Sequence, residues 1–162
     1  MKVKSGLFLK YISVLVFFFL FFILQSCNKP EKQPGNTSIP GNVKVLSSHE
    51  DLQNALDSNS SKLMVIDLYA DWCMPCKQLS PVLNSLSIEH TGNTVFYKVN
   101  VDKNPEIAAM FGVQGIPHVV FVKNKEPFYA ITGLYPKDAY KKVITVCGAA
   151  ESPDICQKQM QM

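Results

Sequence analysis

Two cysteines, Cys73 and Cys76, are separated by two residues where an apolar stretch gives way to apolar residues at helical spacing. On the first turn of a helix, residues i and i+3 are neighbours, so the two sulfur atoms come within bonding distance. The free N–H groups and the positive dipole end at a helix N-terminus stabilise a thiolate. We therefore predict that Cys73 attacks a disulfide and that Cys76 resolves the mixed disulfide that forms.

A pair of this kind is also half of many zinc sites. The sequence contains five cysteines, and no second pair has the spacing of a zinc-binding partner. The pattern therefore favours redox chemistry, and no metal is expected.

An acidic residue, Asp67, interrupts the apolar run LMVIDLYA between Leu63 and Ala70. A buried acid without a partner costs several kcal/mol, which favours a functional role for Asp67 over that of an acid satisfied only by structural hydrogen bonds. Lys98 is compatible both with a role near this acid and with an ordinary place on a strand face. His118 lies in another apolar strand, where a structural role is the commoner one.

The segment from Val65 to Lys77, VIDLYADWCMPCK, resembles the active-site stretch of the thioredoxin family. Further landmarks follow in the family's order over residues 43–147. The resemblance implies that Asp67 relays a proton to and from Cys76 through water. It also implies that Lys98 pairs with this acid.

The dipeptide Ile116-Pro117 matches the family's cis-proline opposite the cysteines. The resemblance implies that backbone groups here hydrogen-bond an incoming substrate in the manner of a strand. Trp72, directly before the first cysteine, either packs beneath the start of the helix or contacts substrate.

The two residues between the cysteines, Met74 and Pro75, tune the redox pair. They differ from the Gly-Pro of thioredoxin, but proline directly before the second cysteine resembles the reducing members of the family. We expect a thiol:disulfide oxidoreductase that reduces disulfides of exported proteins, with no cofactor beyond the Cys73–Cys76 disulfide. The alternatives are a disulfide oxidase or isomerase, and a copper-carrying or redox-inert binding module. The two-residue spacing of the cysteines speaks against copper delivery.

Two further cysteines, Cys147 and Cys156, lie in the C-terminal segment VCGAAESPDIC, outside the family's pattern. In an oxidising compartment we expect them to bond to each other as a structural disulfide. A second redox relay is the alternative.

The elements around these residues predict an α/β domain with the thioredoxin fold, in which about four helices flank a central mixed sheet of about five strands. Ser47 and Glu50 predict a capping box at the first helix of this domain. Strands are expected at 43–46, 63–70, 94–101, 118–123 and 128–132, and helices at 48–57, 74–89, 104–112 and 136–147.

The N-terminal residues 1–26 have the architecture of a signal peptide. Lysines at 2, 4 and 10 precede an apolar run from Tyr11 to Leu24, which is shorter than the roughly 20 residues that cross a bilayer comfortably. A short uncleaved membrane anchor is the alternative. Either interpretation places the rest of the chain outside the cytoplasm.

The segment Leu24-Gln25-Ser26-Cys27 resembles the lipobox of bacterial lipoproteins, although Gln25 departs from it. The resemblance implies a lipid on Cys27 that holds the protein on a bacterial membrane, facing the periplasm or the outer face of the envelope. Residues 27–42 are rich in Pro, Gly, Asn and Lys and predict a flexible tether. The thioredoxin-like domain is expected at 43–149 and a C-terminal extension at 150–162.

The charge balance excludes some partners. Three of the 16 basic residues belong to the signal region, which leaves 13 against 13 acidic residues, and the sequence has no arginine. Nucleic acid is therefore not an expected partner. We expect a monomer that meets protein disulfides as substrates, a membrane electron donor, and a membrane surface through the lipid on Cys27.

Overall fold

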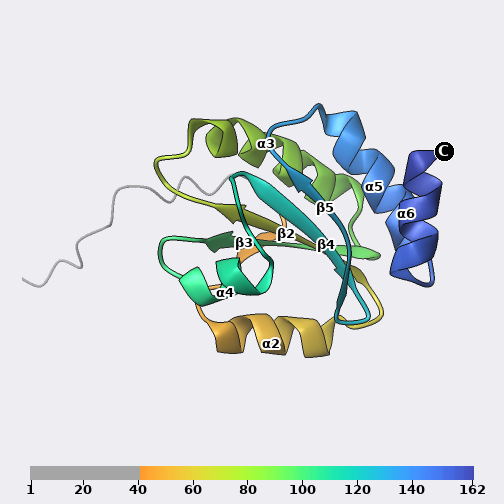
Figure 1. The fold of residues 1–162 in the computed structure, drawn as a ribbon, viewed down its shortest axis with the longest axis horizontal. Helices are drawn as coiled ribbons and strands as arrows, with labels where there is room; N and C mark the ends of the chain where they lie inside the picture. Colours follow the sequence, from red (N-terminus) through yellow and green to blue (C-terminus); the bar gives the residue numbers. More distant parts are fainter. Residues whose placement is uncertain (1–40) are drawn as a thin grey trace, which may run out of the picture. The chain divides into compact units, whose positions relative to one another are not determined.

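The computed structural model describes residues 41–162, which form a five-stranded sheet with helices on both faces (Figure 1). The predicted signal peptide, Cys27 with its expected lipid, and nearly all of the predicted tether lie outside the described residues. Within this range, no helix is long and apolar enough to cross a membrane.

The sheet is mixed and has the spatial order β1-β3-β2-β4-β5. β3 pairs in parallel with β1 and β2, whereas β4 runs antiparallel to β2 and β5. The strands are β1 (Val43–Val45), β2 (Leu63–Tyr69), β3 (Thr94–Asn100), β4 (His118–Lys123) and β5 (Glu126–Thr132). This arrangement confirms the predicted fold class, although β5 begins two residues earlier than expected.

Five helices lie within residues 41–162: α2 (His49–Ser58), α3 (Met74–Glu89), α4 (Pro105–Met110), α5 (Lys137–Ala149) and α6 (Pro153–Gln161). α2 and α4 pack on one face of the sheet, and α3 and α5 pack on the other (Figure 1). The chain contains Pro81 within α3, and the helix continues through it.

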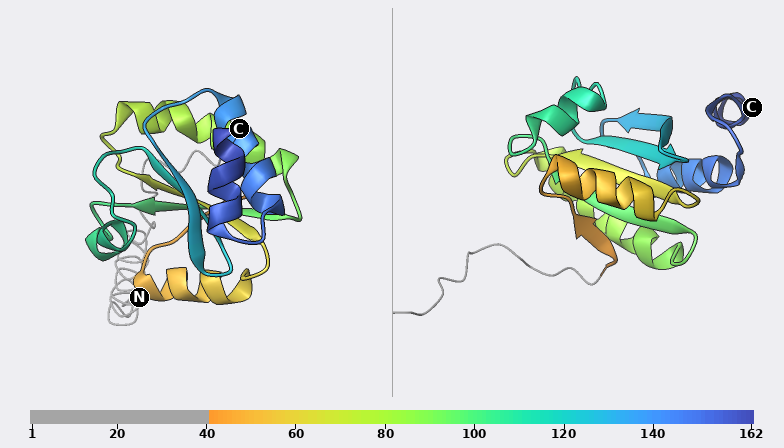
Figure 2. Two further views of the ribbon diagram at one scale, coloured as in Figure 1. Left: turned by 45° about the vertical axis from the view of Figure 1, so that its right-hand side comes forward. Right: turned by 90° about the horizontal axis from the view of Figure 1, so that it is seen from below.

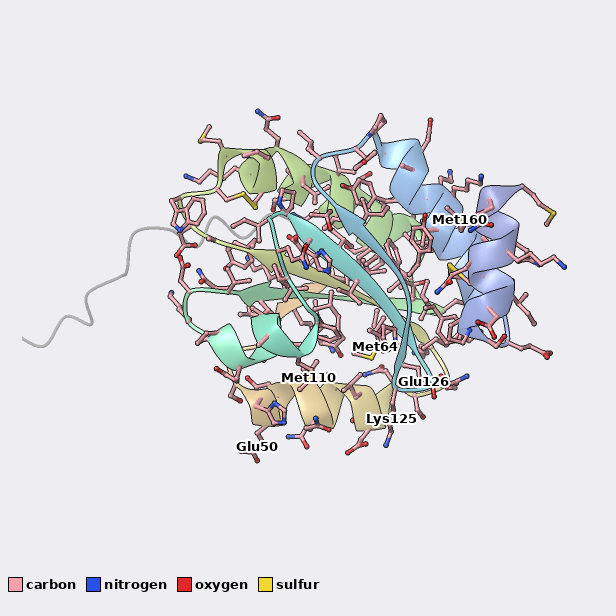
Figure 3. All side chains as sticks on the ribbon, in the orientation of Figure 1. Glu50, Met64, Met110, Lys125, Glu126 and Met160 are labelled. Carbon is pink, nitrogen blue, oxygen red and sulfur yellow. A yellow bond between two sulfur atoms is a disulfide. The ribbon has the colours of Figure 1, made fainter. Side chains whose placement is uncertain are left out.

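β2 is buried on both faces because its side chains alternate between two cores. Leu63 and Val65 pack in the cluster beneath α3 and α5, whereas Met64 and Ile66 pack in the cluster toward α2 and α4. Met64 is labelled on the α2 side of the sheet in Figure 3. Asp67 continues the first series, so its carboxyl faces the layer that contains α3.

The N-cap of α2 lies one residue later than the predicted capping box placed it. Ser48, not Ser47, is the N-cap, and its hydroxyl accepts a hydrogen bond from the N–H of Asp51 at 3.1 Å. The Asp51 carboxylate in turn accepts from the backbone N–H of Ser47 at 2.8 Å. Glu50 takes no part in these two hydrogen bonds.

The C-terminal extension contains a helix that the sequence interpretation did not assign. α6 packs against α5 and β5, and Figure 2 shows it beside α5. Its start carries two helix signals, since Ser152 is the N-cap and Pro153 occupies the first turn.

Candidate active site

Cys73 and Cys76 form a disulfide at the start of α3, with their Cα atoms 5.3 Å apart. Cys73 is the N-cap of the helix, and its sulfur accepts a hydrogen bond from the N–H of Cys76 at 3.2 Å. Both residues are 3% exposed, so burial does not tell them apart. Their positions distinguish the two residues, because Cys73 caps the helix and its sulfur receives the N–H groups that stabilise a thiolate.

Asp67 lies beneath this disulfide in the middle of the sheet. The residue is 6% exposed, and its Oδ1 atom has no hydrogen-bond partner among the described residues. Burial raises the pKa of the Asp67 carboxyl to about 7, and the positive charge of Lys98 opposes this rise. The carboxyl can therefore gain and lose a proton near neutral pH.

A pocket of about 130 Å³ connects Asp67 with Cys76. Its lining also includes Tyr69, Ala70, Asp71, Lys77, Ser80 and Lys98. A pocket of this volume has room for several water molecules, and the polar groups in its lining would bind them. A water-mediated path between carboxyl and sulfur therefore fits the geometry.

Lys98 lies directly opposite Asp67 on the neighbouring parallel strand. None of the ion pairs formed within residues 41–162 joins these two side chains. The ammonium of Lys98 instead lies over the ring of Tyr69, 5.6 Å from its centroid. The pairing implied by the family resemblance is thus a longer-range charge interaction in this structure.

The peptide bond between Ile116 and Pro117 is cis, as the resemblance implied. Ile116 packs against a small cluster formed by Ala70 and the two cysteines. The carbonyl of Pro117 accepts a hydrogen bond from the N–H of Gly133 at 2.8 Å, which ties this segment to the end of β5. These contacts place the dipeptide beside the disulfide.

Trp72 is 68% exposed and therefore does not pack beneath the helix start. Its indole Nε1 donates a hydrogen bond to the Asp102 carboxylate at 2.9 Å. Met74 is also well exposed, so two large apolar side chains flank Cys73 at the surface. The sequence analysis had not identified Asp102, although its place shortly after β3 brings it to the same end of the sheet.

His118 follows Pro117 but points away from the Asp67 pocket. It lies opposite Leu68 in the sheet register, and Leu68 packs toward α2 and α4. Its Nδ1 atom is 2.8 Å from the Thr132 hydroxyl, while burial lowers the pKa of the ring. This position favours the structural interpretation of His118.

Cys147 and Cys156 form the second disulfide and are both fully buried. They link the end of α5 to α6 and belong to the core cluster beneath α3 and α5. Gly148 is the neighbour of Cys147 on α5, and a Cβ atom there would contact Leu63, the first residue of β2. Cys73 instead lies after Tyr69, the last residue of β2. The second disulfide thus lies at the opposite end of β2 from the first.

The described residues contain no cluster of three or more His, Cys, Asp or Glu side chains that could hold a metal ion.

A protein-family model described as Thioredoxin matches residues 43–146, and the chain therefore belongs to the thioredoxin family. The thioredoxin of Staphylococcus saprophyticus is 37% identical over 102 residues, which cover 63% of this chain and 93% of that protein. Thioredoxin H4 of Arabidopsis thaliana is 36% identical over 97 residues, covering 60% and 80%.

Among solved structures, the thioredoxin NaTrxh from Nicotiana alata superposes with a TM-score of 0.64 at 34% identity, over 68% of this chain and 96% of that one. The thioredoxin of Malassezia sympodialis gives a TM-score of 0.61 at 34% identity, over 67% and 93%. The family and the Cys73–Cys76 pair together support thiol–disulfide oxidoreductase chemistry for this protein.

Proposed function

We propose that this protein reduces disulfides of exported proteins by dithiol–disulfide exchange through Cys73 and Cys76. The observation that carries the proposal is the pocket shared by Asp67 and Cys76, which joins a buried carboxyl titrating near neutral pH to the resolving sulfur. A cysteine pair that only held the fold together would not need a proton acceptor of this kind.

The first step forms a mixed disulfide. The Cys73 thiolate attacks one sulfur of the substrate disulfide, the substrate S–S bond breaks, and the second substrate sulfur leaves as a thiolate that takes a proton from water. The N–H groups at the start of α3 stabilise the attacking thiolate.

The second step releases the substrate. Asp67 accepts the proton of the Cys76 thiol through water in the pocket, and the Cys76 thiolate attacks Cys73 to restore the disulfide seen in the structure. The remaining substrate sulfur leaves and takes up a proton. The substrate has then gained two electrons and two protons, and a donor dithiol must reduce the Cys73–Cys76 disulfide again.

The substrate would bind across Trp72, Met74, Ile116 and Pro117. Trp72 and Met74 offer exposed apolar surface, and the backbone beside the cis-proline offers hydrogen bonds to an extended segment. This combination suits polypeptides whose disulfides lie in accessible, extended segments.

The support for the reducing direction and for the location of the protein comes from the sequence. Pro75 directly before Cys76 resembles reducing members of the family, and the signal-like residues 1–26 with the lipobox-like Cys27 support export and attachment to a membrane surface. In that setting a membrane protein would supply the electrons, and the predicted tether would let the monomeric domain reach its substrates. The Cys73–Cys76 disulfide serves as the redox centre without a further cofactor.

The direction is tested by measuring the reduction potential of the Cys73–Cys76 pair against glutathione, in a variant without the second disulfide. A potential near that of reducing thioredoxins, about −270 mV, supports a reductase, whereas one near −120 mV marks an oxidase. Trapping with Cys76→Ser, which stalls Cys73 in mixed disulfides, then identifies the substrates. Stoichiometric binding of Cu(I) without thiol turnover would instead indicate a copper carrier.

A further inference from the structure

We propose that Tyr69 is a positioning residue, whose ring holds the Lys98 ammonium inside the pocket shared by Asp67 and Cys76 and thereby limits how readily Asp67 takes up a proton. This inference rests on the proposed role of Asp67 in deprotonating Cys76.

The sheet geometry brings the three side chains together. Asp67 and Tyr69 lie two residues apart on β2 and therefore face the same side of the sheet. The parallel register places Lys98 of β3 opposite Asp67, on that same side. All three residues line the pocket that reaches Cys76.

Tyr69 holds Lys98 through the face of its ring. The ammonium lies 5.6 Å from the ring centroid, within the range of a cation–π contact. The Lys98 ammonium forms no hydrogen bond or ion pair within residues 41–162, so the Tyr69 ring is what fixes the end of this flexible side chain. A lysine without that contact would extend into water.

The phenol of Tyr69 stays neutral, so its contact with Lys98 joins an ammonium to an uncharged ring. Burial raises the pKa of the Tyr69 hydroxyl, and the negative charges of Asp71 and Asp67 raise it further. The ring therefore keeps its negative π face without carrying a charge of its own that would act on Asp67.

The other ionisable groups around Asp67 are few. Asp71 and Lys77 line the same pocket, and Tyr140 on α5 is close enough that, beside burial, the Asp67 charge raises its pKa. Neither β4 nor α3 adds a charged group beyond these to the pocket lining. The positive charge of Lys98 lowers the pKa of Asp67, so the position of Lys98 decides how far burial raises that pKa.

The test measures the protonation of Asp67 directly. The carboxyl carbons of the oxidised full-length protein, in detergent micelles, are followed by NMR through a pH titration, and Asp67→Asn assigns the Asp67 signal. In Tyr69→Leu we expect Asp67 to bind its proton roughly threefold more tightly than in the unaltered protein. Tyr69→Phe keeps the aromatic face and should titrate like the unaltered protein. Tyr69→Met is a second variant without a π face, should Tyr69→Leu fold poorly.

A double-mutant cycle shows whether Tyr69 acts through Lys98. Lys98→Met should raise the proton affinity of Asp67 at least as much as Tyr69→Leu, and adding Tyr69→Leu to Lys98→Met should cause no further change. An equal effect of Tyr69→Leu in the presence and absence of Lys98 would overturn the inference, as would a shift in Tyr69→Phe as large as that in Tyr69→Leu.

A failure of the proposed function gives a different result from a failure of this inference. If Asp67 does not serve Cys76, the rate at which Cys76 resolves a mixed disulfide will have the same pH profile in Asp67→Asn as in the unaltered protein. The NMR titration of Asp67 would still report on Tyr69 and Lys98 in that case.

Discussion

Trp72 is largely exposed to solvent, yet its indole is held by the Asp102 carboxylate through a hydrogen bond of 2.9 Å. The two residues come from different loops, one before α3 and one after β3. An exposed aromatic side chain that is fixed in this way loses little conformational entropy when a protein docks on it.

Removal of this hydrogen bond should loosen Trp72 and weaken substrate binding. Since Trp72 is the only tryptophan in the sequence, its fluorescence anisotropy reports the change directly. We expect Asp102→Ala to lower the anisotropy and to raise KM for a protein disulfide roughly 2- to 10-fold, the equivalent of one hydrogen bond. Asp102→Asn keeps an acceptor oxygen and serves as the control. Unchanged anisotropy in Asp102→Ala would show that packing alone holds the indole.

Asp67 should make the oxidised protein less stable as the pH rises. Its pKa is about 7 in the folded protein against 3.8 for an ordinary aspartate. Between about pH 4 and pH 7 the folded protein therefore keeps a proton that the unfolded chain has released, and the free energy of unfolding falls with rising pH. The full difference, about 4 kcal/mol, is reached above pH 7.

Urea unfolding of Asp67→Asn at pH 4 and pH 8 measures this effect. The variant should lack most of the decline and should gain stability relative to the unaltered protein at pH 8. Asp57→Asn, which changes an exposed aspartate, is the matched control and should keep the decline. A decline of the same size in Asp67→Asn would assign it to other groups.

Two neighbouring serines, Ser47 and Ser48, have different roles at the start of α2. Ser48→Ala removes the hydroxyl that accepts from Asp51 and should lower the free energy of unfolding by about 1 kcal/mol. Ser47→Ala should have little effect, because only the backbone N–H of Ser47 takes part. Equal losses in thermal unfolding would contradict the assignment of Ser48 as the N-cap.

The second disulfide should matter for stability and not for redox turnover. Replacement of both Cys147 and Cys156 by Ala is expected to lower the free energy of unfolding by about 2–4 kcal/mol. Amide hydrogen exchange should increase in α6, because this disulfide ties α6 to α5. The rate of insulin reduction should stay unchanged; a clear drop would revive the redox-relay interpretation of this pair.

The sheet was predictable because apolar runs mark strands that are buried on both faces, as in β2. The same pattern exposes Asp67 as an exception, and family order locates Lys98 and Pro117. The cap was harder to place, because Ser47 and Ser48 each precede an acid by three residues. Only the backbone conformation decides between them.

Features that depend on three-dimensional side-chain positions were not predictable. The contact of Lys98 with Tyr69 depends on rotamers across two strands, and the Trp72–Asp102 hydrogen bond joins residues 30 positions apart. α6 is short and largely polar, so its helical pattern is weak. The cap at Ser152 and the proline after it were the available signals.

The cluster beneath α3 and α5 includes both sulfur atoms of the Cys147–Cys156 disulfide. Part of the hydrophobic core is therefore completed by an oxidation reaction and not by packing alone. If the chain is exported as proposed, the completion of its core depends on the compartment it has reached. Before export, the reduced chain is easier to unfold and can pass through a translocation channel. After arrival in an oxidising space, the disulfide forms and the fold acquires its final rigidity.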